Sequence, residues 1–455
     1  MSHRTSHKFA REITQWVAFT LAIAGGSHAS CDQSRAGEIP AKPNLVWIWA
    51  DNLGYGDLAC YGNRSIKTPR IDELAAEGAR FTSHLVAHVV CSPSRAALIT
   101  GRQPFRSSIV AVLRPDGPNG MPDDEITLAE ALRDTGYATL AIGKWHLGDR
   151  AAYLPTRHGF DHYFGIPYSL DMAPTILFDD ERTVDRLDGD KVQNVTERYT
   201  DEAIRFVRQN RERPFFIHFA HSLPHRPINL PAKDRTPGRP IYEDAVETID
   251  REVGRLVDTI DELGLAERTL IIFSSDNGPQ SRLGSSAPFR GGIGSAYEGG
   301  LRVPMLARFR GVVPTGLVVD EPTIMYDIFP TFVRLAGGKM ASDRVYDGQD
   351  IWPLFTGGEI DREHPFFWVH TDKVSAVRDG KWKLHVAKGD APLAVPELYD
   401  LSKDVGERLP VTDQPEIVER LAAAAREFEA TIPKAWTLIY TVRDPEKLPS
   451  GVRKE

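Results

Sequence analysis

Short runs of β-branched and aromatic residues alternate along the chain with segments that have the hydrophobic spacing of a helix. The clearest helical segment is 242–263, where apolar residues recur every three or four positions and charged residues fill the rest. The alternation predicts strands at 44–50, 138–143, 214–220 and 269–275, and helices at 68–78, 128–135, 197–210 and 242–263. This order is typical of an α/β protein with a doubly wound, mostly parallel sheet whose strands are buried on both faces.

Past about residue 345 the pattern changes to short strands that follow one another closely. Strands are predicted at 365–370, 375–378 and 381–386, with a hairpin turn at Asp379-Gly380 and a helix at 416–430. We therefore expect an N-terminal α/β domain at 43–345. A smaller C-terminal subdomain at 346–455 is expected to hold an antiparallel sheet and one helix.

The composition is that of an ordinary globular protein. Of the 455 residues, 41% are hydrophobic and 26% charged, which excludes collagen-like, coiled-coil and wholly disordered chains. The net charge of -8 provides no overall basic field, so no nucleic-acid partner is expected.

The N-terminal residues 1–29 have the pattern of a signal peptide. Basic residues precede the uncharged run 16–26, which is too short to span a bilayer, and Ala29 ends a small-residue cleavage site. We expect an exported protein, periplasmic or secreted, with no integral membrane segment after cleavage. Cys31 leaves lipoprotein anchoring as a minority alternative, since His28 stands where a lipobox has an aliphatic residue.

Polar residues directly follow each predicted strand of the large sheet. Ligands of open α/β sheets bind beyond the carboxyl ends of the strands, so these residues are candidates for a site. In chain order they are Asp51, Asn52, Lys144, His146, His221, His225, Asp276 and Asn277. We interpret His221, and His218 within its strand, as structural.

The two Asp-Asn pairs could hold a divalent cation. Asp51, Asn52, Asp276 and Asn277 offer oxygen ligands without thiolate or imidazole, which favours Ca²⁺ or Mg²⁺ over zinc. Asx residues also cap turns, and for either pair alone this reading is as good. Two pairs at equivalent strand ends favour the cation.

The stretch 91–102 reads Cys-Ser-Pro-Ser-Arg-Ala-Ala-Leu-Ile-Thr-Gly-Arg. A polar start and a glycine stop predict a short helix with Cys91 at its N-terminus, where free N–H groups attract anions. Arg95 lies one turn further on the same face. A lone cysteine is more often a small buried hydrophobe, so the surrounding motif decides its role.

This motif, Cys-x-Pro-Ser-Arg followed by Ala-x-x-x-Thr-Gly-Arg, resembles the signature of the type I sulfatases, in which the cysteine is converted to Cα-formylglycine. The similarity covers most of 43–405. Its further segments are Ala50-Asp51-Asn52-Leu53-Gly54, Gly143-Lys144-Trp145-His146, Ser275-Asp276-Asn277-Gly278-Pro279, Tyr297-Glu298-Gly299-Gly300 and Leu398-Tyr399-Asp400-Leu401. The segment 165–169 and the surroundings of His225 resemble the arylsulfatase A and N-acetylgalactosamine-6-sulfatase branch.

The resemblance implies an alkaline-phosphatase-like fold and hydrolysis of an aryl or carbohydrate sulfate ester. It implies that a formylglycine-generating enzyme modifies Cys91, and that the hydrated aldehyde attacks sulfur and later expels sulfate. Ca²⁺, with Mg²⁺ as the fallback, would bind Asp51, Asn52, Asp276, Asn277 and the modified Cys91.

The resemblance also implies roles for the other site residues. Arg95 would orient the formylglycine, Lys144 and Ser169 would bind sulfate oxygens, and His146 would serve sulfate elimination. His225 would bind sulfate and protonate the leaving alcohol. The alternative readings are that Lys144 is a solvated lysine, that Ser169 forms a turn, and that the two histidines are structural.

Two positions depart from the family pattern. Asn52 stands where a second carboxylate is common, and Ile293 stands where a lysine usually contacts the sulfate. Arg290, in the same loop, could replace that lysine or could be an ordinary surface arginine. Two other functions remain open from the sequence: a phosphodiesterase or phosphonate hydrolase of the same superfold, and a weakly active protein that binds sulfated glycans.

Overall fold

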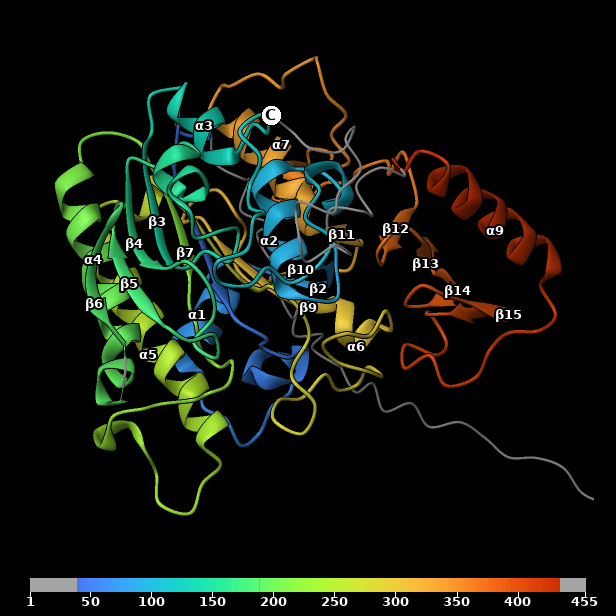
Figure 1. Cartoon of the computed structure of the whole chain (residues 1–455), viewed down its shortest axis with the longest axis horizontal. Coiled ribbons are helices and arrows are strands. Elements are labelled where there is room, and N and C mark those ends of the chain that lie inside the picture. The colour runs from blue at the N-terminus through green and yellow to red at the C-terminus, as the bar shows by residue number, and fades with distance from the viewer. Residues whose placement is uncertain (1–38, 188, 434–455) are drawn as a thin grey trace, which may run out of the picture. The chain divides into compact units, whose positions relative to one another are not determined.

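The computed structural model describes residues 39–187 and 189–433 (Figure 1). The predicted signal peptide at 1–29, its cleavage site and Cys31 lie outside these residues. Within the described part of the chain, no helix has the length and apolar character needed to cross a membrane.

The larger of two sheets has a parallel centre flanked by antiparallel strands. Its order is β10-β2-β9-β8-β1-β7-β3-β4-β5-β6, with β11 paired to β2. The neighbours β8, β1, β7, β3 and β4 are parallel to one another, while β9 and β5 run antiparallel to the strands beside them. The strands are β1 (Asn44–Ala50), β2 (Ala79–Leu85), β3 (Ala138–Lys144), β4 (His162–Ile166), β5 (Ile176–Asp179), β6 (Arg182–Arg186), β7 (Phe215–Ala220), β8 (Thr269–Ser275), β9 (Arg302–Arg308), β10 (Leu317–Val319) and β11 (Thr323–Ile324).

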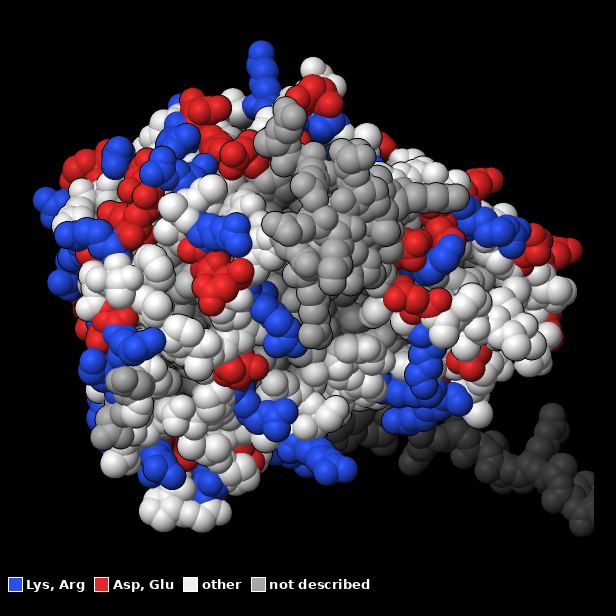
Figure 2. All heavy atoms as spheres, in the orientation of Figure 1, with Lys and Arg blue, Asp and Glu red and all other residues white. Residues whose placement is uncertain are grey.

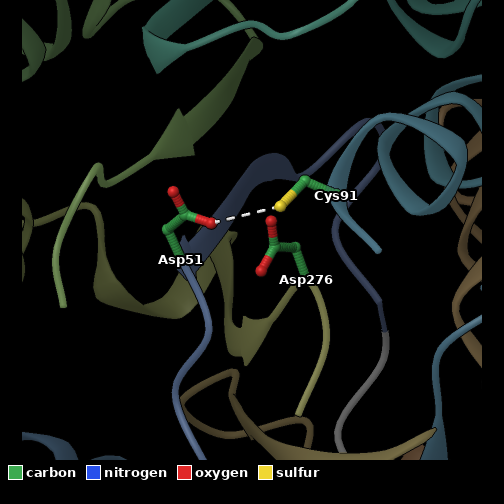
Figure 3. A group of neighbouring side chains, drawn as sticks. All are labelled: Asp51, Cys91 and Asp276. Atoms are coloured by element: carbon green, nitrogen blue, oxygen red, sulfur yellow. Dashed lines mark hydrogen bonds between the residues drawn. The ribbon is translucent and has the colours of Figure 1, made fainter. Parts of the chain in front are cut away.

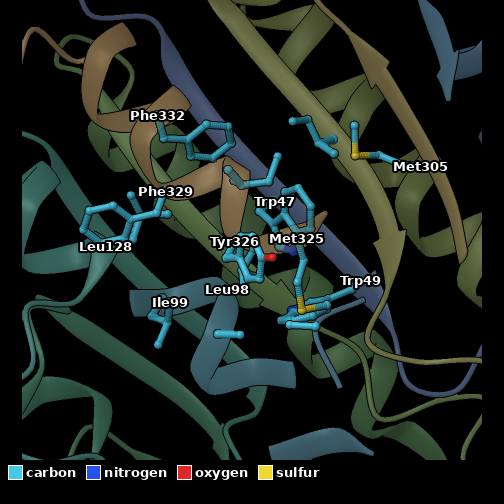
Figure 4. Close-up of a cluster of buried hydrophobic side chains, with 14 of the residues drawn as sticks. Trp47, Trp49, Leu98, Ile99, Leu128, Met305, Met325, Tyr326, Phe329 and Phe332 are labelled. Carbon is cyan, nitrogen blue, oxygen red and sulfur yellow. The ribbon is translucent and has the colours of Figure 1, made fainter. Parts of the chain in front are cut away.

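Helices cover both faces of this sheet. They are α1 (Pro69–Ala76), α2 (Cys91–Thr100), α3 (Leu128–Arg133), α4 (Val195–Asn210), α5 (Ile241–Glu262), α6 (Glu298–Leu301), α7 (Ile328–Leu335) and α8 (Trp352–Phe355). Alternate residues of β1 enter two separate cores. Trp47 and Trp49 pack with α2 and α7 (Figure 4), whereas Val46 and Ile48 pack with α4 and α5. The predicted doubly wound, mostly parallel sheet is confirmed.

The smaller sheet is antiparallel, with the order β12-β13-β14-β15. Its strands are β12 (Phe366–Val369), β13 (Val374–Asp379), β14 (Trp382–Lys388) and β15 (Ala391–Asp400), and α9 (Pro415–Glu429) packs against it (Figure 1). Gly380 has a φ of 55° in the turn between β13 and β14, as the predicted Asp379-Gly380 hairpin requires. The predicted small sheet with one helix is confirmed, and β15 is a further strand. The domain division at 345/346 stays a prediction.

Candidate functional site

The site begins where β1 and β8 end side by side. These strands are parallel, and Ala50 lies opposite Ser275, so Asp51 and Asp276 leave the sheet at the same level. The backbone N–H of Asn52 donates to Asp276 Oδ1 at 3.0 Å. The predicted meeting of the two Asp-Asn pairs at one sheet edge is therefore seen in the structure.

Helix α2 brings Cys91 to this edge. The helix starts at Cys91 and ends at Gly101, whose φ of 70° is the left-handed conformation that suits a glycine C-cap. Cys91 Sγ lies 3.7 Å from Asp51 Oδ1 and 3.8 Å from Asn52 Oδ1. In Figure 3 the side chains of Cys91, Asp51 and Asp276 point toward one another, and all three are buried.

Two buried cations neutralise the two carboxylates. Lys144, the last residue of β3, donates from Nζ to Asp51 Oδ2 at 2.7 Å. Arg95 donates from Nη2 to Asp276 Oδ2 at 2.8 Å and from Nη1 to the Lys144 carbonyl at 2.6 Å, and Nη2 lies 3.7 Å from Asp51 Oδ1. These four side chains together carry no net charge.

The packing of these charges sets their protonation. Burial alone would raise the pKa of Asp51, but the charges of Lys144, His225 and Arg95 bring it well below its usual value. Burial and the charge of Asp51 raise the pKa of Asp276. Burial likewise raises the pKa of the Cys91 thiol, so the cysteine is a neutral thiol here.

The two asparagines complete an oxygen-rich cluster. Asn52 has a φ of 65°, a left-handed conformation that Asn tolerates better than most residues. Asn277 Nδ2 donates to Asn52 Oδ1, while Asn277 Oδ1 is buried without a hydrogen-bond partner among the described residues. The cluster has two carboxylates and two side-chain amides, and one amide oxygen is buried without a partner. Such a set of oxygens fits a hard divalent cation.

His146, just after β3, and Ser169, just after β4, are buried side chains with unused hydrogen-bonding atoms. His146 has a φ of 61°, and its Nε2 lies 3.1 Å from the Leu113 carbonyl, which places the ring proton on Nε2. Burial, and then Lys144 and Arg95, lower the pKa of His146 well below its usual value. His146 Nδ1 and Ser169 Oγ have no hydrogen-bond partner in the described part of the chain, so both are available to a ligand.

His225 lies close enough to Asp51 to contribute to the lowered pKa of that carboxyl. Its Nδ1 is 2.5 Å from the Arg226 carbonyl, and its Nε2 lies 3.4 Å from Gln280 Nε2. In contrast, His218 and His221 are fully buried in or just after β7. His218 accepts from Trp49 Nε1 at 3.4 Å, and His221 stacks on Phe219.

The structure does not bring Arg290 to the cluster. Its guanidinium donates to the Glu407 carbonyl at 2.8 Å and lies 3.9 Å from the centre of the Tyr297 ring. The loop around Ile293 does approach α2, because the N–H of Gly294 donates to the Val89 carbonyl at 2.9 Å. The expectation that Arg290 replaces the missing lysine is therefore unsupported by its position.

No local sequence pattern points to two supporting residues, Ser92 and Gln280. Ser92 Oγ accepts from the Leu113 N–H at 3.1 Å, and the Leu113 carbonyl accepts from His146 Nε2. Gln280 meets both His225 and the Arg226 side chain. Both contacts join segments far apart in the chain, which no local pattern reveals.

Comparison with known proteins identifies the family of the chain. Residues 43–338 match the family model described as Sulfatase. Human arylsulfatase A is 38% identical over 81% of this chain and 83% of its own length. Dog N-acetylgalactosamine-6-sulfatase is 32% identical over 86% of this chain and 87% of its own.

A solved structure shares the fold over a similar range. The crystal structure of Ps i-CgsB in complex with k-i-k-neocarrahexaose has a TM-score of 0.78 and 30% identity, and the match covers 86% of this chain and 94% of that one. The chain therefore belongs to the sulfatase family, in the branch of arylsulfatase A and N-acetylgalactosamine-6-sulfatase, and is a sulfuric ester hydrolase.

Proposed function

We propose that this hydrolase cleaves an aryl or carbohydrate sulfate ester with a formylglycine made from Cys91 and with a bound Ca²⁺. The observation that carries the proposal is the position of Cys91 Sγ, buried at the start of α2 and 3.7 Å from Asp51 Oδ1. The position matters more than the thiol itself. A nucleophile at residue 91 would lie beside both the proposed metal ligands and the cations proposed to bind sulfate.

The state of the thiol supports the conversion. A thiolate is the reactive form of cysteine, and burial raises the pKa of the Cys91 thiol, so unmodified Cys91 is a poor nucleophile. Once formed and hydrated, formylglycine would supply one hydroxyl for attack on sulfur and a second whose deprotonation would release sulfate and restore the aldehyde.

The charged side chains of the site favour binding of an anion once a cation is bound. Arg95 and Lys144 balance the two carboxylates, so a divalent cation would give these groups a net positive charge that attracts a sulfate ester. Asp51, Asn52, Asp276 and Asn277 would hold the ion, with Mg²⁺ as the alternative occupant. When bound, the cation would activate the attacking hydroxyl and stabilise charge on the sulfate.

The remaining side chains bind the sulfate and move protons. Lys144 donates hydrogen bonds to sulfate oxygens, and Ser169 contributes its unpartnered hydroxyl. His146 is neutral, and its free Nδ1 can accept the proton of the elimination step. His225 binds sulfate and protonates the leaving alcohol.

Three further expectations belong to this proposal. A formylglycine-generating enzyme acts on Cys91 during maturation, and the chain is exported. The proposed domain division assigns 43–345 to the catalytic domain and 346–455 to the smaller subdomain.

The proposal is tested with a Cys91→Ala variant and a small aryl sulfate. Turnover should be lost while the circular dichroism spectrum and thermal unfolding stay those of the wild type, because Cys91 makes only weak sulfur contacts. Undiminished sulfatase activity in this variant would refute the nucleophile.

A further inference from the structure

Gln280 links the loop after β8 to the loop after β7. These two strands lie on either side of β1 and parallel to it, so His225 and Gln280 leave the sheet at the edge that carries Asp51. Gln280 is half-buried, and its backbone carbonyl accepts from the N–H groups of Leu283 and Gly284. Because these backbone contacts do not involve the side chain, a substitution at position 280 should leave the loop in place.

The donors of Arg226 fix the orientation of the Gln280 amide. Gln280 Oε1 lies 3.4 Å from the backbone nitrogen of Arg226 and 3.2 Å from its Nε. Both of these groups can only donate, so the carbonyl oxygen of the amide must face them. The NH₂ group of the amide then faces His225 Nε2, at a distance of 3.4 Å.

This orientation fixes the tautomer of the neutral His225 ring. An NH₂ group only donates, so His225 Nε2 must accept, and the ring proton lies on Nδ1. The carbonyl of Arg226, 2.5 Å from Nδ1, accepts the hydrogen bond of that proton. His146 has the opposite tautomer, with its proton on Nε2 and an Nδ1 that has no partner among the described residues.

The same amide decides what a second proton on His225 can bind. In the protonated ring both nitrogens donate, and Nδ1–H keeps the Arg226 carbonyl as its acceptor. Nε2–H then faces the Gln280 NH₂ group, which cannot accept, and Nε2 has no other hydrogen-bond partner in the described part of the chain. A carboxylate at position 280 would accept that proton, whereas the amide leaves it for an acceptor on the substrate.

We propose that Gln280 is a positioning residue that keeps the Nε2 proton of His225 available to the leaving alcohol. As the S–O bond breaks, its electron pair stays on the leaving oxygen, which takes the Nε2 proton, and His225 returns to the Nδ1–H form. The inference rests on the proposed function, from which it takes the role of His225. A glutamate at this position would hold the proton that the leaving group needs.

The tautomer is measured without turnover from the ¹⁵N chemical shifts of histidine-labelled protein, and the His225 signals are identified by their loss in His225→Gln. In the neutral ring of the wild type, Nδ1 should be the protonated nitrogen and Nε2 the unprotonated one. Gln280→Glu should protonate Nε2, because its carboxylate accepts the hydrogen bond. A wild-type proton on Nε2, or an unprotonated Nε2 in Gln280→Glu, would overturn the inference.

The kinetic test uses a series of aryl sulfates whose phenols differ in acidity. A proton from His225 matters most for the ester of the least acidic phenol, because that phenol is the poorest leaving group. Gln280→Glu should lose at least about tenfold in kcat/KM on this ester, and progressively less as the phenol becomes more acidic.

The matched control is Gln209→Glu. Gln209 also accepts from an arginine, Arg205 Nη1 at 3.3 Å, but it is exposed on α4, so its substitution should leave the whole series unchanged. An equal loss on every ester in Gln280→Glu, or no loss on the least acidic phenol, would overturn the inference. Turnover that persists in Cys91→Ala would refute the proposed nucleophile instead, while the tautomer of His225 would still test the role of Gln280.

Discussion

At the scale of single residues, Ile293 is the clearest departure from the family pattern. Its loop approaches the segment before α2, because the Gly294 N–H donates to the Val89 carbonyl. An apolar side chain cannot donate to a sulfate oxygen. Since one charged donor in such a site is worth on the order of 10²–10³ in rate, the native enzyme should be slow on simple aryl sulfates.

Ile293→Lys should therefore raise kcat/KM on an activated aryl sulfate by at least about tenfold, measured under steady-state conditions. Arg290→Ala should change it little, because Arg290 is bound to the Glu407 carbonyl and the Tyr297 ring. A large loss in Arg290→Ala, with no gain in Ile293→Lys, would show that Arg290 serves the sulfate after all.

At the scale of elements, the ends of β1 and β8 set the charge of the cation site. Asn52 offers a neutral oxygen beside Asp51, so the site has one carboxylate fewer than a strand end with two aspartates. Asn52→Asp should bind Ca²⁺ about tenfold more tightly by calorimetric titration, because added ligand charge strengthens a hard-cation site. Its melting temperature without metal should fall, since a third buried carboxylate lacks a partner. Unchanged affinity would mean that Asn52 is not a ligand.

A second element-scale feature joins β14 of the small sheet to the start of α6 and to the segment after β15. Lys383 is fully buried, with its Nζ 2.9 Å from Glu298 Oε1 and 3.2 Å from Glu407 Oε1. Lys383→Met should lower the free energy of unfolding by about 1–3 kcal/mol in denaturant titrations, because the buried Glu407 carboxylate loses its lysine while Glu298 keeps Arg302 and Arg378.

The matched control is Lys381→Met in the turn before β14. Lys381 is 51% exposed and lies 3.4 Å from Asp400 Oδ2, and such surface pairs contribute about 0–1 kcal/mol. Equal small losses in both variants would mean that the buried network contributes little to stability.

The strand-end residues show what a single sequence can predict at this scale. Buried apolar runs located β1, β3, β7 and β8, and the rule that sites lie beyond the carboxyl ends of strands then selected Asp51, Lys144 and Asp276. The flanking antiparallel strands β2, β9, β5 and β6 were not predicted, because their pairing depends on long-range neighbours rather than on local periodicity. The contacts of Ser92 and Lys383 were missed for the same reason, because their partners lie far away in the chain.

At the scale of the whole molecule, positive and negative side chains are interspersed over the face seen in Figure 2, so no field of one sign dominates it. The interior carries a different electrostatic feature. Burial lowers the pKa of four histidines to about 3: His84, His88, His218 and His221. In the unfolded chain these groups titrate near their ordinary value of about 6.5.

The free energy of unfolding should consequently fall as the pH drops below about 6.5, because the histidines then bind protons in the unfolded chain but not in the folded one. Burial raises the pKa of Asp57 and of Asp250 to about 6, and these two carboxyls oppose the trend below that pH. Histidines with a lowered pKa, His146 included, outnumber these two carboxyls, so unfolding takes up protons near pH 5.5. Each proton taken up lowers the free energy of unfolding by about 1.4 kcal/mol per pH unit.

Chemical denaturation between pH 7 and 5 measures this slope. His221→Leu should reduce the slope by about 1.4 kcal/mol per pH unit, the contribution of one proton. The substitution removes no hydrogen bond, because neither ring nitrogen of His221 has a partner among the described residues. A free energy of unfolding that is constant across this range would contradict the account.

The central claim is that Cys91 is converted to formylglycine, and it is tested most directly by mass spectrometry of the Cys91 peptide from active enzyme. The account predicts that the peptide has the mass of the aldehyde in place of the thiol. It also predicts that the specific activity on an aryl sulfate is proportional to the converted fraction across preparations made with and without a co-expressed formylglycine-generating enzyme. Full activity in a preparation whose Cys91 is entirely an unmodified thiol would contradict it.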